Sequence, residues 1–230
     1  MKFSTSVNIE RDIEKDFDYI VTPNSKSVFN QLLNNYHAGI HSFNIIGSYG
    51  TGKSSFLLAL EKNLKKENIY FAPPNGQFNG LSQFKFLNIV GKYTSLENLI
   101  AEKLNLNTNS KNLLKELDNY YKQVEKENKF LIILIDEFGK VLEYAANNNP
   151  ERELYFIQQF SEFVNNTNYN ILFLTTLHQT FSSYSIFLTN SQRNEWDKVK
   201  GRFKEIAFNE PVEQLLFLAA AQQLTRRKAI

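Results

Sequence analysis

Gly47-Ser48-Tyr49-Gly50-Thr51-Gly52-Lys53-Ser54 is the stretch that decides the fold of this chain. It fills every required position of the phosphate-binding loop pattern G-x-x-x-x-G-K-[S/T]. An apolar run at 43–46 precedes it, and Phe56, Leu57, Leu60 and Leu64 then recur on one helical face. A chance glycine-rich turn before a helix is the alternative interpretation. The order of strand, glycine turn and helix favours a loop that binds a nucleotide.

The residue types of this loop suit a phosphate ligand. Its glycines let backbone N–H groups turn inward around phosphates, and the following helix N-terminus adds positive potential. We expect Lys53 to reach the β- and γ-phosphate oxygens and the Ser54 hydroxyl to ligate Mg²⁺. The predicted cofactors are therefore ATP and Mg²⁺. The predicted binding residues are Gly47, Ser48, Tyr49, Gly50, Thr51, Gly52, Lys53, Ser54 and Ser55.

Composition bounds the class of protein. The 230 residues suffice for one α/β domain with a small appendage, and the 42% hydrophobic content supports a full core. A net charge of +2 does not indicate a nucleic-acid partner. The absence of Cys excludes disulfides and thiolate metal sites, and three His residues argue against a His-rich one. With no apolar run of membrane-spanning length and no signal-peptide core, we expect a cytoplasmic protein without membrane contact.

Apolar patterning predicts the architecture. The unbroken run at 130–135 suits a central parallel strand buried on both faces. Strands are predicted at 43–46, 84–90, 130–135, 171–175 and 204–208, with a short one at 69–72, and helices at 24–37, from the loop to about 66, at 95–104, 110–127 and 151–166. Asn24 or Ser25 is expected to cap the first helix. Alternating strands and helices predict an α/β P-loop NTPase sandwich of three layers, with a parallel five-stranded sheet and helices on both faces.

The predicted organisation has three parts. Residues 1–23 form an N-terminal segment, residues 24–209 the α/β ATPase core, and residues 210–230 the beginning of a helical lid. A helix pattern starts at Pro211, a favourable first-turn residue, and then stops. We therefore expect a fragment of a longer protein with a truncated lid.

Asp136 and Glu137 close the apolar run at 130–135. Ligands of parallel sheets lie at the carboxyl ends of strands, so both acids are expected to face the phosphate loop. We expect Asp136 to hold the Mg²⁺ shell, and Glu137 to orient and deprotonate an attacking water, which phosphoryl transfer requires. An ordinary acidic turn after a strand is the alternative interpretation.

The next predicted strand ends in Thr175-Thr176-Leu177-His178-Gln179. A polar side chain there is placed to hydrogen-bond the γ-phosphate or the water. Thr176 and His178 both qualify, and the residue types do not choose between them. A solvated strand end is the alternative.

The segment from Val199 to Pro211 contains Gly201-Arg202-Phe203 before Ile206-x-Phe208-x-x-Pro211. This arrangement resembles the arginine-finger box of AAA+ ATPases, especially the origin-recognition-like initiator branch. The order of phosphate loop, acidic strand end, polar strand end and arginine box matches as well, over about residues 15–225. The resemblance implies that Arg202 reaches the γ-phosphate bound by a neighbouring subunit, and hence a homo-oligomer or larger assembly. A surface arginine beside a strand is the alternative, and Arg193 and Arg226 are weaker candidates.

Two finer features follow from this resemblance. The segment before the first helix often contacts adenine in such families, which points to Ile20, Val21 and Pro23, although ordinary packing would explain them equally. Phrases around Ile135–Lys140 and Leu188–Arg193 are similar to large bacterial ATPases of phage-defence islands, the BREX type. The lid is too short to identify a second-sensor arginine, since Arg226 and Arg227 fall too early.

The sequence thus predicts an ATP-binding and ATP-hydrolysing AAA+ type domain, the motor or switch fragment of a larger bacterial protein acting in phage defence. Its protein partner is not identified. A monomeric signalling NTPase switch and a nucleotide-gated scaffold with little hydrolysis are the rivals. A small-molecule kinase shares the loop but usually lacks both the acidic strand end and an arginine box.

Overall fold

A single parallel sheet organises the chain. The structure, a computed structural model, describes residues 7–71, 78–106 and 113–210. The strands are β1 (Ser42–Ile46), β2 (Phe84–Val90), β3 (Phe130–Asp136), β4 (Ile171–Leu177) and β5 (Lys204–Ala207). Their order across the sheet is β2-β3-β4-β1-β5, and every pair is parallel. The predicted parallel five-stranded sheet is confirmed.

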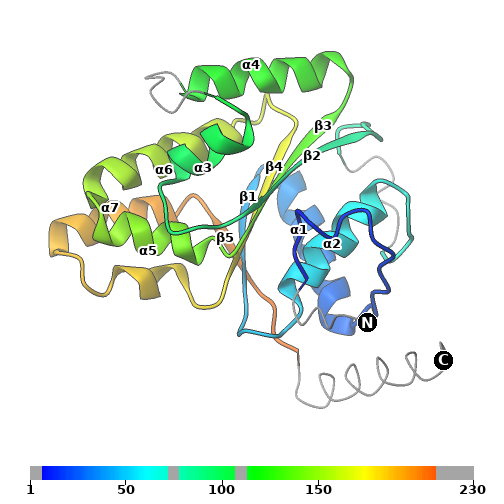
Figure 1. Ribbon diagram of the computed structural model, residues 1–230, viewed down its shortest axis with the longest axis horizontal. Helices are drawn as coiled ribbons and strands as arrows, with labels where there is room; N and C mark the ends of the chain where they lie inside the picture. Colours follow the sequence, from blue (N-terminus) through cyan, green and yellow to red (C-terminus); the bar gives the residue numbers. More distant parts are fainter. Residues whose placement is uncertain (1–6, 72–77, 107–112, 211–230) are drawn as a thin grey trace.

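Helices cover both faces of this sheet (Figure 1). They are α1 (Pro23–His37), α2 (Lys53–Leu64), α3 (Leu96–Lys103), α4 (Leu113–Lys126), α5 (Gly139–Asn147), α6 (Pro150–Val164) and α7 (Asn190–Lys200), with a 3₁₀ helix η1 (Phe181–Ser185). Helices α1 and α2 lie on one side, and α3 to α7 lie on the other (Figure 1). The three-layer α/β sandwich predicted from the apolar patterning is therefore the observed fold.

Strand β3 lies at the centre of both hydrophobic clusters. Leu131, Ile133 and Ile135 pack with the helices of the α3–α7 side. Phe130, Ile132 and Leu134 pack with α1 and α2 on the other side. All six side chains are fully buried, because successive residues of a strand point to opposite faces of a sheet. Truncating any one of them to Ala is expected to cost about 2–5 kcal/mol of stability.

The structure differs from the expected elements in three ways. Helix α1 is capped by Thr22 rather than Asn24 or Ser25: Thr22 Oγ1 accepts the N–H of Ser25 at 3.0 Å, and Pro23 takes the first helical position. Residues 69–71 form no strand. Helices α5 and α7 and the η1 turn are additional elements. The predicted helix starts at 110 and 211, and hence the lid, lie outside the described residues.

Candidate nucleotide site

The phosphate loop leaves the sheet at the carboxyl end of β1. The Gly47 N–H donates to Leu177 O of β4 at 3.1 Å, and on the other side the Phe208 N–H donates to Ile46 O at 2.6 Å. A Cβ added at Gly47 would lie 2.2 Å from Phe208 O. Glycine is therefore the only residue type that fits at position 47, where the loop passes between the neighbouring chain segments.

The rest of the loop is built for exposed backbone donors. Gly50 and Gly52 have φ values of +78° and +93°, which glycine adopts without strain. Nothing lies within 4 Å of a Cβ added at either position, so this side of the loop is open. The Thr51 hydroxyl donates to Ser48 O at 2.9 Å and closes the turn. Gly52 gives α2 no side-chain cap, which leaves its first N–H groups for an anion.

Lys53 lies across this loop. Its Nζ donates to Gly47 O at 2.5 Å and to Ser48 O at 2.8 Å. Burial lowers the pKa of Lys53, and the negative charge of Asp136 acts in the opposite direction. The ammonium group is thus held at the loop, with Asp136 close enough to influence its charge. This geometry places a cation beside the open backbone donors.

Asp136 is the last residue of β3, and its carboxylate is tied to β4. The residue is buried. Its Oδ1 accepts the Thr176 hydroxyl at 2.5 Å and the Glu137 N–H at 3.1 Å. Thr176 Oγ1 also accepts the Glu137 N–H at 2.9 Å. The hydroxyl of Thr176, 1% exposed, therefore both donates and accepts within the turn that carries the two acids.

Glu137 occupies an unusual backbone conformation. Its φ is +56°, which costs an L-residue about 1–2 kcal/mol. The Gly91 N–H donates to Asp136 O at 2.7 Å, and a Cβ added at Gly91 would lie 2.3 Å from Glu137 O. The turn is thus fixed from the end of β2 as well as from β4. The Glu137 side chain is 46% exposed and forms an ion pair with Lys140, so its carboxylate is within reach of solvent.

His178 contacts the tip of the phosphate loop. Its ring stacks on Tyr49 with centroids 4.6 Å apart and planes at 21°. The Tyr184 hydroxyl lies 3.4 Å from His178 Nδ1. The same hydroxyl would be 2.2 Å from a Cβ added at Gly139, the first residue of α5. The structure therefore brings His178 to the loop, and ties Thr176 to the acidic turn.

Arg202 lies at the other end of the sheet. It precedes β5, whose residue Lys204 pairs with Phe43, whereas the phosphate loop starts four residues beyond Phe43. At about 3.3 Å per residue this separation is at least about 13 Å along the strands. The Arg202 side chain instead forms an ion pair with Glu162 of α6. Arg202 is thus not brought to the phosphate loop of its own chain.

The N-terminal segment is joined to the chain segment that follows β5. The Thr22 hydroxyl donates to the carboxylate of Glu210, which also accepts from Asn24 Nδ2 at 3.3 Å. Glu210 follows Phe208, the residue whose carbonyl abuts Gly47. Ile20 and Val21 are each 36% exposed, and Pro23 begins α1. This segment is therefore anchored at a residue two positions after Phe208.

Some residues that shape the site were not predicted from the sequence. Gly91 and Gly139 fit where side chains would collide, and Glu210, beyond the end of β5, is joined to the N-terminal segment through Thr22. A glycine directly after a strand marks a close backbone approach, so Gly91 carried a usable signal. Nothing in the sequence pairs Glu210 with Thr22, because 188 residues separate them.

The donor set fits Mg²⁺ but no all-protein metal cage. Within residues 7–71, 78–106 and 113–210, no group of three or more His, Cys, Asp or Glu side chains could hold a metal ion. Mg²⁺ is usually held by one or two protein oxygens together with waters and substrate phosphates. Asp136 and Ser54, the second residue of α2, supply two suitable oxygens.

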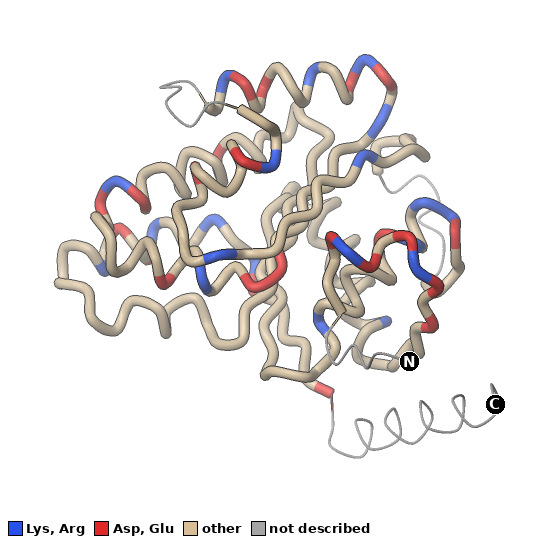
Figure 2. The backbone as a smooth tube through the Cα atoms, viewed as in Figure 1, with Lys and Arg blue, Asp and Glu red and all other residues tan. Residues whose placement is uncertain are grey.

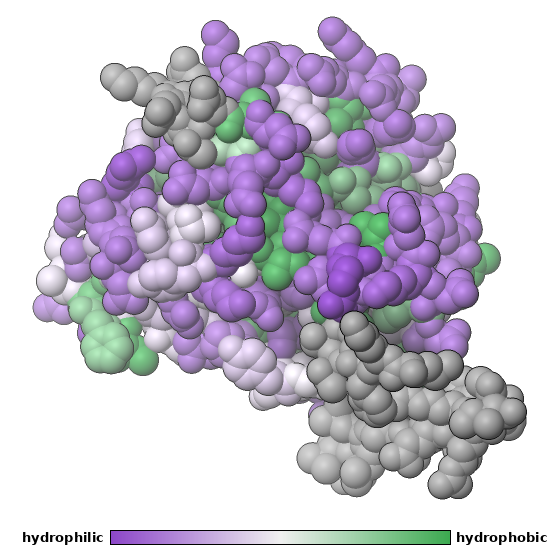
Figure 3. All heavy atoms as spheres, in the orientation of Figure 1, coloured by the Kyte–Doolittle hydropathy of each residue, from purple (hydrophilic) through white to green (hydrophobic). Residues whose placement is uncertain are grey.

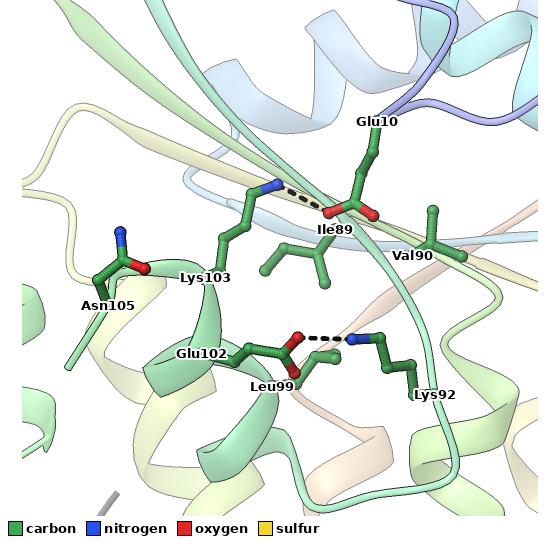
Figure 4. A pocket seen from close by; sticks show the side chains of 8 residues that line it. All are labelled: Glu10, Ile89, Val90, Lys92, Leu99, Glu102, Lys103 and Asn105. Carbon is green, nitrogen blue, oxygen red and sulfur yellow. Dashed lines mark hydrogen bonds and ion pairs between the residues drawn. The ribbon is translucent and has the colours of Figure 1, made fainter. Parts of the chain in front are cut away.

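A cavity elsewhere does not belong to this site. It has a volume of 310 Å³ and lies along β2 and α3. Two ion pairs cross its lining, Lys103 with Glu10 at 2.7 Å and Lys92 with Glu102 at 2.6 Å (Figure 4). It contains none of the predicted site residues, and its facing charges neutralise one another.

The surface is of mixed character. Lys residues are interspersed with Asp and Glu along α4, without a stripe of one sign in this view (Figure 2). Figure 3 shows a mostly hydrophilic face, with hydrophobic side chains gathered near the end where η1 meets α7. Ile186 and Phe187, 61% and 95% exposed, lie in that connection. In the described part of the chain, no helix is long and apolar enough to cross a membrane.

Solved structures share this fold. The ORC2 protein of Aeropyrum pernix in its ADP form matches 92% of this chain and 55% of its own, with a TM-score of 0.56 at 17% identity. The same protein with ADPNP and ADP matches 86% of this chain and 51% of its own, with a TM-score of 0.53 at 15% identity. Cdc6p from Pyrobaculum aerophilum matches 94% and 52%, with a TM-score of 0.50 at 17% identity.

The chain therefore has an α/β P-loop NTPase-like fold, which it shares with these ORC2 and Cdc6p structures. It spans about half the length of the solved structures that it matches. No family model matches the chain, and no curated protein matches it in sequence.

Proposed function

We propose that this chain binds ATP with Mg²⁺ and hydrolyses it, and that a neighbouring copy completes the site. The observation that carries the proposal is a division of the chemistry between two ends of the sheet. Lys53, Asp136 and Glu137 gather at the carboxyl ends of β1 and β3, whereas Arg202 precedes β5.

Each residue near the phosphate loop has a proposed role. The loop from Gly47 to Ser55 binds the phosphates, with Lys53 as their cation. Ser54 and Asp136 hold Mg²⁺, which would offset phosphate charge when bound. Glu137 orients and deprotonates the attacking water, a task for which its accessible carboxylate is suited.

The two polar residues at the end of β4 receive different roles. Thr176 is a positioning residue, because its hydroxyl is already engaged by Asp136 and by the Glu137 N–H. His178 is the better candidate for contact with the γ-phosphate, since it lies beside Tyr49 of the loop. Ile20, Val21 and Pro23 are proposed to contact the adenine ring.

Arg202 is proposed to act on the nucleotide of a neighbouring subunit. Its position before β5 keeps it away from the phosphate loop of its own chain. A guanidinium remains charged and offers planar donors that match a phosphate. Residues 24–209 would then be the catalytic core of a larger protein, and the resemblance to BREX-type ATPases suggests a bacterial motor or switch in phage defence.

Loss of the loop cation tests nucleotide binding. Lys53→Ala should abolish tight binding of ATP·Mg in calorimetry, because no other cation replaces it at the phosphates. Unchanged affinity would show that this loop is not the site.

A mixing experiment in the full chain tests the shared site. Arg202→Ala and Lys53→Ala should each be nearly inactive, since an arginine finger contributes about 10³–10⁵-fold in rate. Their mixture should regain activity wherever an intact loop meets an intact arginine. Wild-type turnover per subunit should also rise with protein concentration. A constant rate would support a monomeric switch, and no hydrolysis at all would support a scaffold.

A further inference from the structure

Arg202 is held in its own chain by one carboxylate. Its backbone is fixed: its N–H donates to Val199 O at 3.0 Å, and its carbonyl accepts from Asn165 Nδ2 at 3.1 Å. Its Nη2 forms an ion pair with Glu162 Oε1, which also accepts from Gln158 Nε2 at 3.0 Å. Only the side chain of Arg202 is therefore free to change partner.

This resting arrangement is weak. Arg202 Nε is buried and has no hydrogen-bond partner among the described residues, and an unmet buried donor opposes the conformation that buries it. The Arg202 and Glu162 side chains are 34% and 47% exposed, and ion pairs of such exposure contribute little. An anion that satisfies more of the donors should therefore displace Glu162.

The guanidinium cannot offer a full fork while it stays on Glu162. Arginine binds phosphate through two parallel N–H groups, either Nε with Nη2 or Nη1 with Nη2. Nε is buried, which removes the first fork, and both forks share Nη2, the atom that pairs with Glu162. Release from Glu162 would let the side chain turn and expose the complete fork.

We propose that Glu162 restrains Arg202 as a resident anion, which the γ-phosphate of a neighbouring subunit's nucleotide displaces. This inference rests on the proposed function of Arg202 across subunits. Glu162 then sets the protein concentration at which the shared site forms. The γ-phosphate at the subunit interface then competes with Glu162 for the guanidinium of Arg202.

The test is Glu162→Gln in the full chain, which keeps the size of the side chain and removes its charge. Turnover is measured with ATP as a function of protein concentration. Assembly is measured over the same concentrations by sedimentation velocity in the presence of a non-hydrolysable ATP analogue. The half-saturating concentration should fall by about 2- to 5-fold, the effect of a weak ion pair. Glu97→Gln, which removes the carboxylate charge that pairs with the exposed Arg152, should leave both curves unchanged.

A background variant separates restraint from general structural effects. In Arg202→Ala, the added Glu162→Gln should no longer shift assembly, because the restrained group is absent. An equal shift in that background would overturn the inference. It would also be overturned if Glu162→Gln alone left the half-saturating concentration unchanged or lowered turnover. A wild-type rate that does not depend on concentration would instead contradict the proposed shared site.

Discussion

Thr176 Oγ1 lies 2.5 Å from Asp136 Oδ1 and accepts the Glu137 N–H at 2.9 Å, so one hydroxyl joins both acids to β4. The register of the sheet produces this contact, because Ile135 pairs with Thr175. A side chain so engaged orients the acidic turn rather than the substrate.

Removal of this hydroxyl should damage stability and turnover together. Thr176→Val keeps the shape but leaves Asp136 Oδ1 with one donor fewer, at a cost of about 1–3 kcal/mol in unfolding free energy. Misplacement of Glu137 should lower turnover by up to about 10²-fold. Denaturant unfolding and phosphate release measure both effects. Thr176→Ser should retain most of each, and equal defects in Ser and Val would contradict the role of the hydroxyl.

Glu137→Gln should separate binding from hydrolysis. The amide keeps the size of the side chain but cannot accept a proton, so ATP affinity should survive in calorimetry. Turnover should fall about 10²-fold or more, a general-base contribution. Parental turnover in the variant would remove Glu137 from the mechanism.

The left-handed backbone of Glu137 predicts that the carboxylate needed for turnover is kept at a cost in stability. Glu137→Ala and Glu137→Gly both lack the carboxylate and should both be nearly inactive. Only glycine adopts the φ of +56° without strain, so the Gly variant should be more stable than the Ala variant by about 1 kcal/mol. Thermal or urea unfolding compares them, and an Ala variant of equal or greater stability would speak against strain at this turn.

The ring pair of Tyr49 and His178 should support the phosphate loop. Tyr49→Ala removes a stacked pair worth about 0.5–1.5 kcal/mol, so ATP affinity should weaken about 2- to 10-fold. Tyr49→Phe keeps the ring and serves as the control. With ADP, which lacks the γ-phosphate that His178 is proposed to contact, adding His178→Ala to Tyr49→Ala should cost no further affinity, and fully additive losses would show that the rings act independently.

His41 should make stability depend on pH. The residue is buried, its ring stacks on Tyr36, and its Nδ1 lies 3.2 Å from Val164 O. Burial lowers the pKa of His41, so below the unfolded pKa of about 6.5 the unfolded chain binds a proton that the folded chain resists. The free energy of unfolding is therefore not reduced by His41 above that pH, and it decreases as the pH falls below it.

The matching measurement compares wild type with His41→Asn, which keeps a donor near Val164 O but does not titrate. Urea unfolding at pH 7.5 and 5.5 should show a larger loss for the wild type. The same loss in both proteins would remove His41 as the cause.

Strong local patterns made the fold predictable. The phosphate loop requires glycine and lysine at fixed spacing, and β3 needs apolar residues throughout because both its faces are buried. Helix α7 carries no such signal, since only Trp196 and Val199 of its residues are buried. Its start depends on a capping box at Thr189 and Gln192, a local signal that periodicity does not reveal.

The site was predictable in its residue types and less so in its connections. Asp136 and Thr176 each end a predicted strand, but their contact depends on β3 and β4 being neighbours in one register. The ion pair of Arg202 with Glu162 depends on how the end of α6 packs beside the turn before β5. Such pairings arise from tertiary packing, and single-sequence patterns contain no information about them.

The placement of Arg202 and the phosphate loop at opposite ends of β5 and β1 gives each subunit a direction. If the arginine serves a neighbour, contacts between copies join unlike surfaces and propagate head to tail. An open row then always ends in one subunit whose loop receives no arginine, whereas a closed ring has no such vacancy. Ring closure would activate the last idle site, so the rate per subunit would report whether the circle is complete.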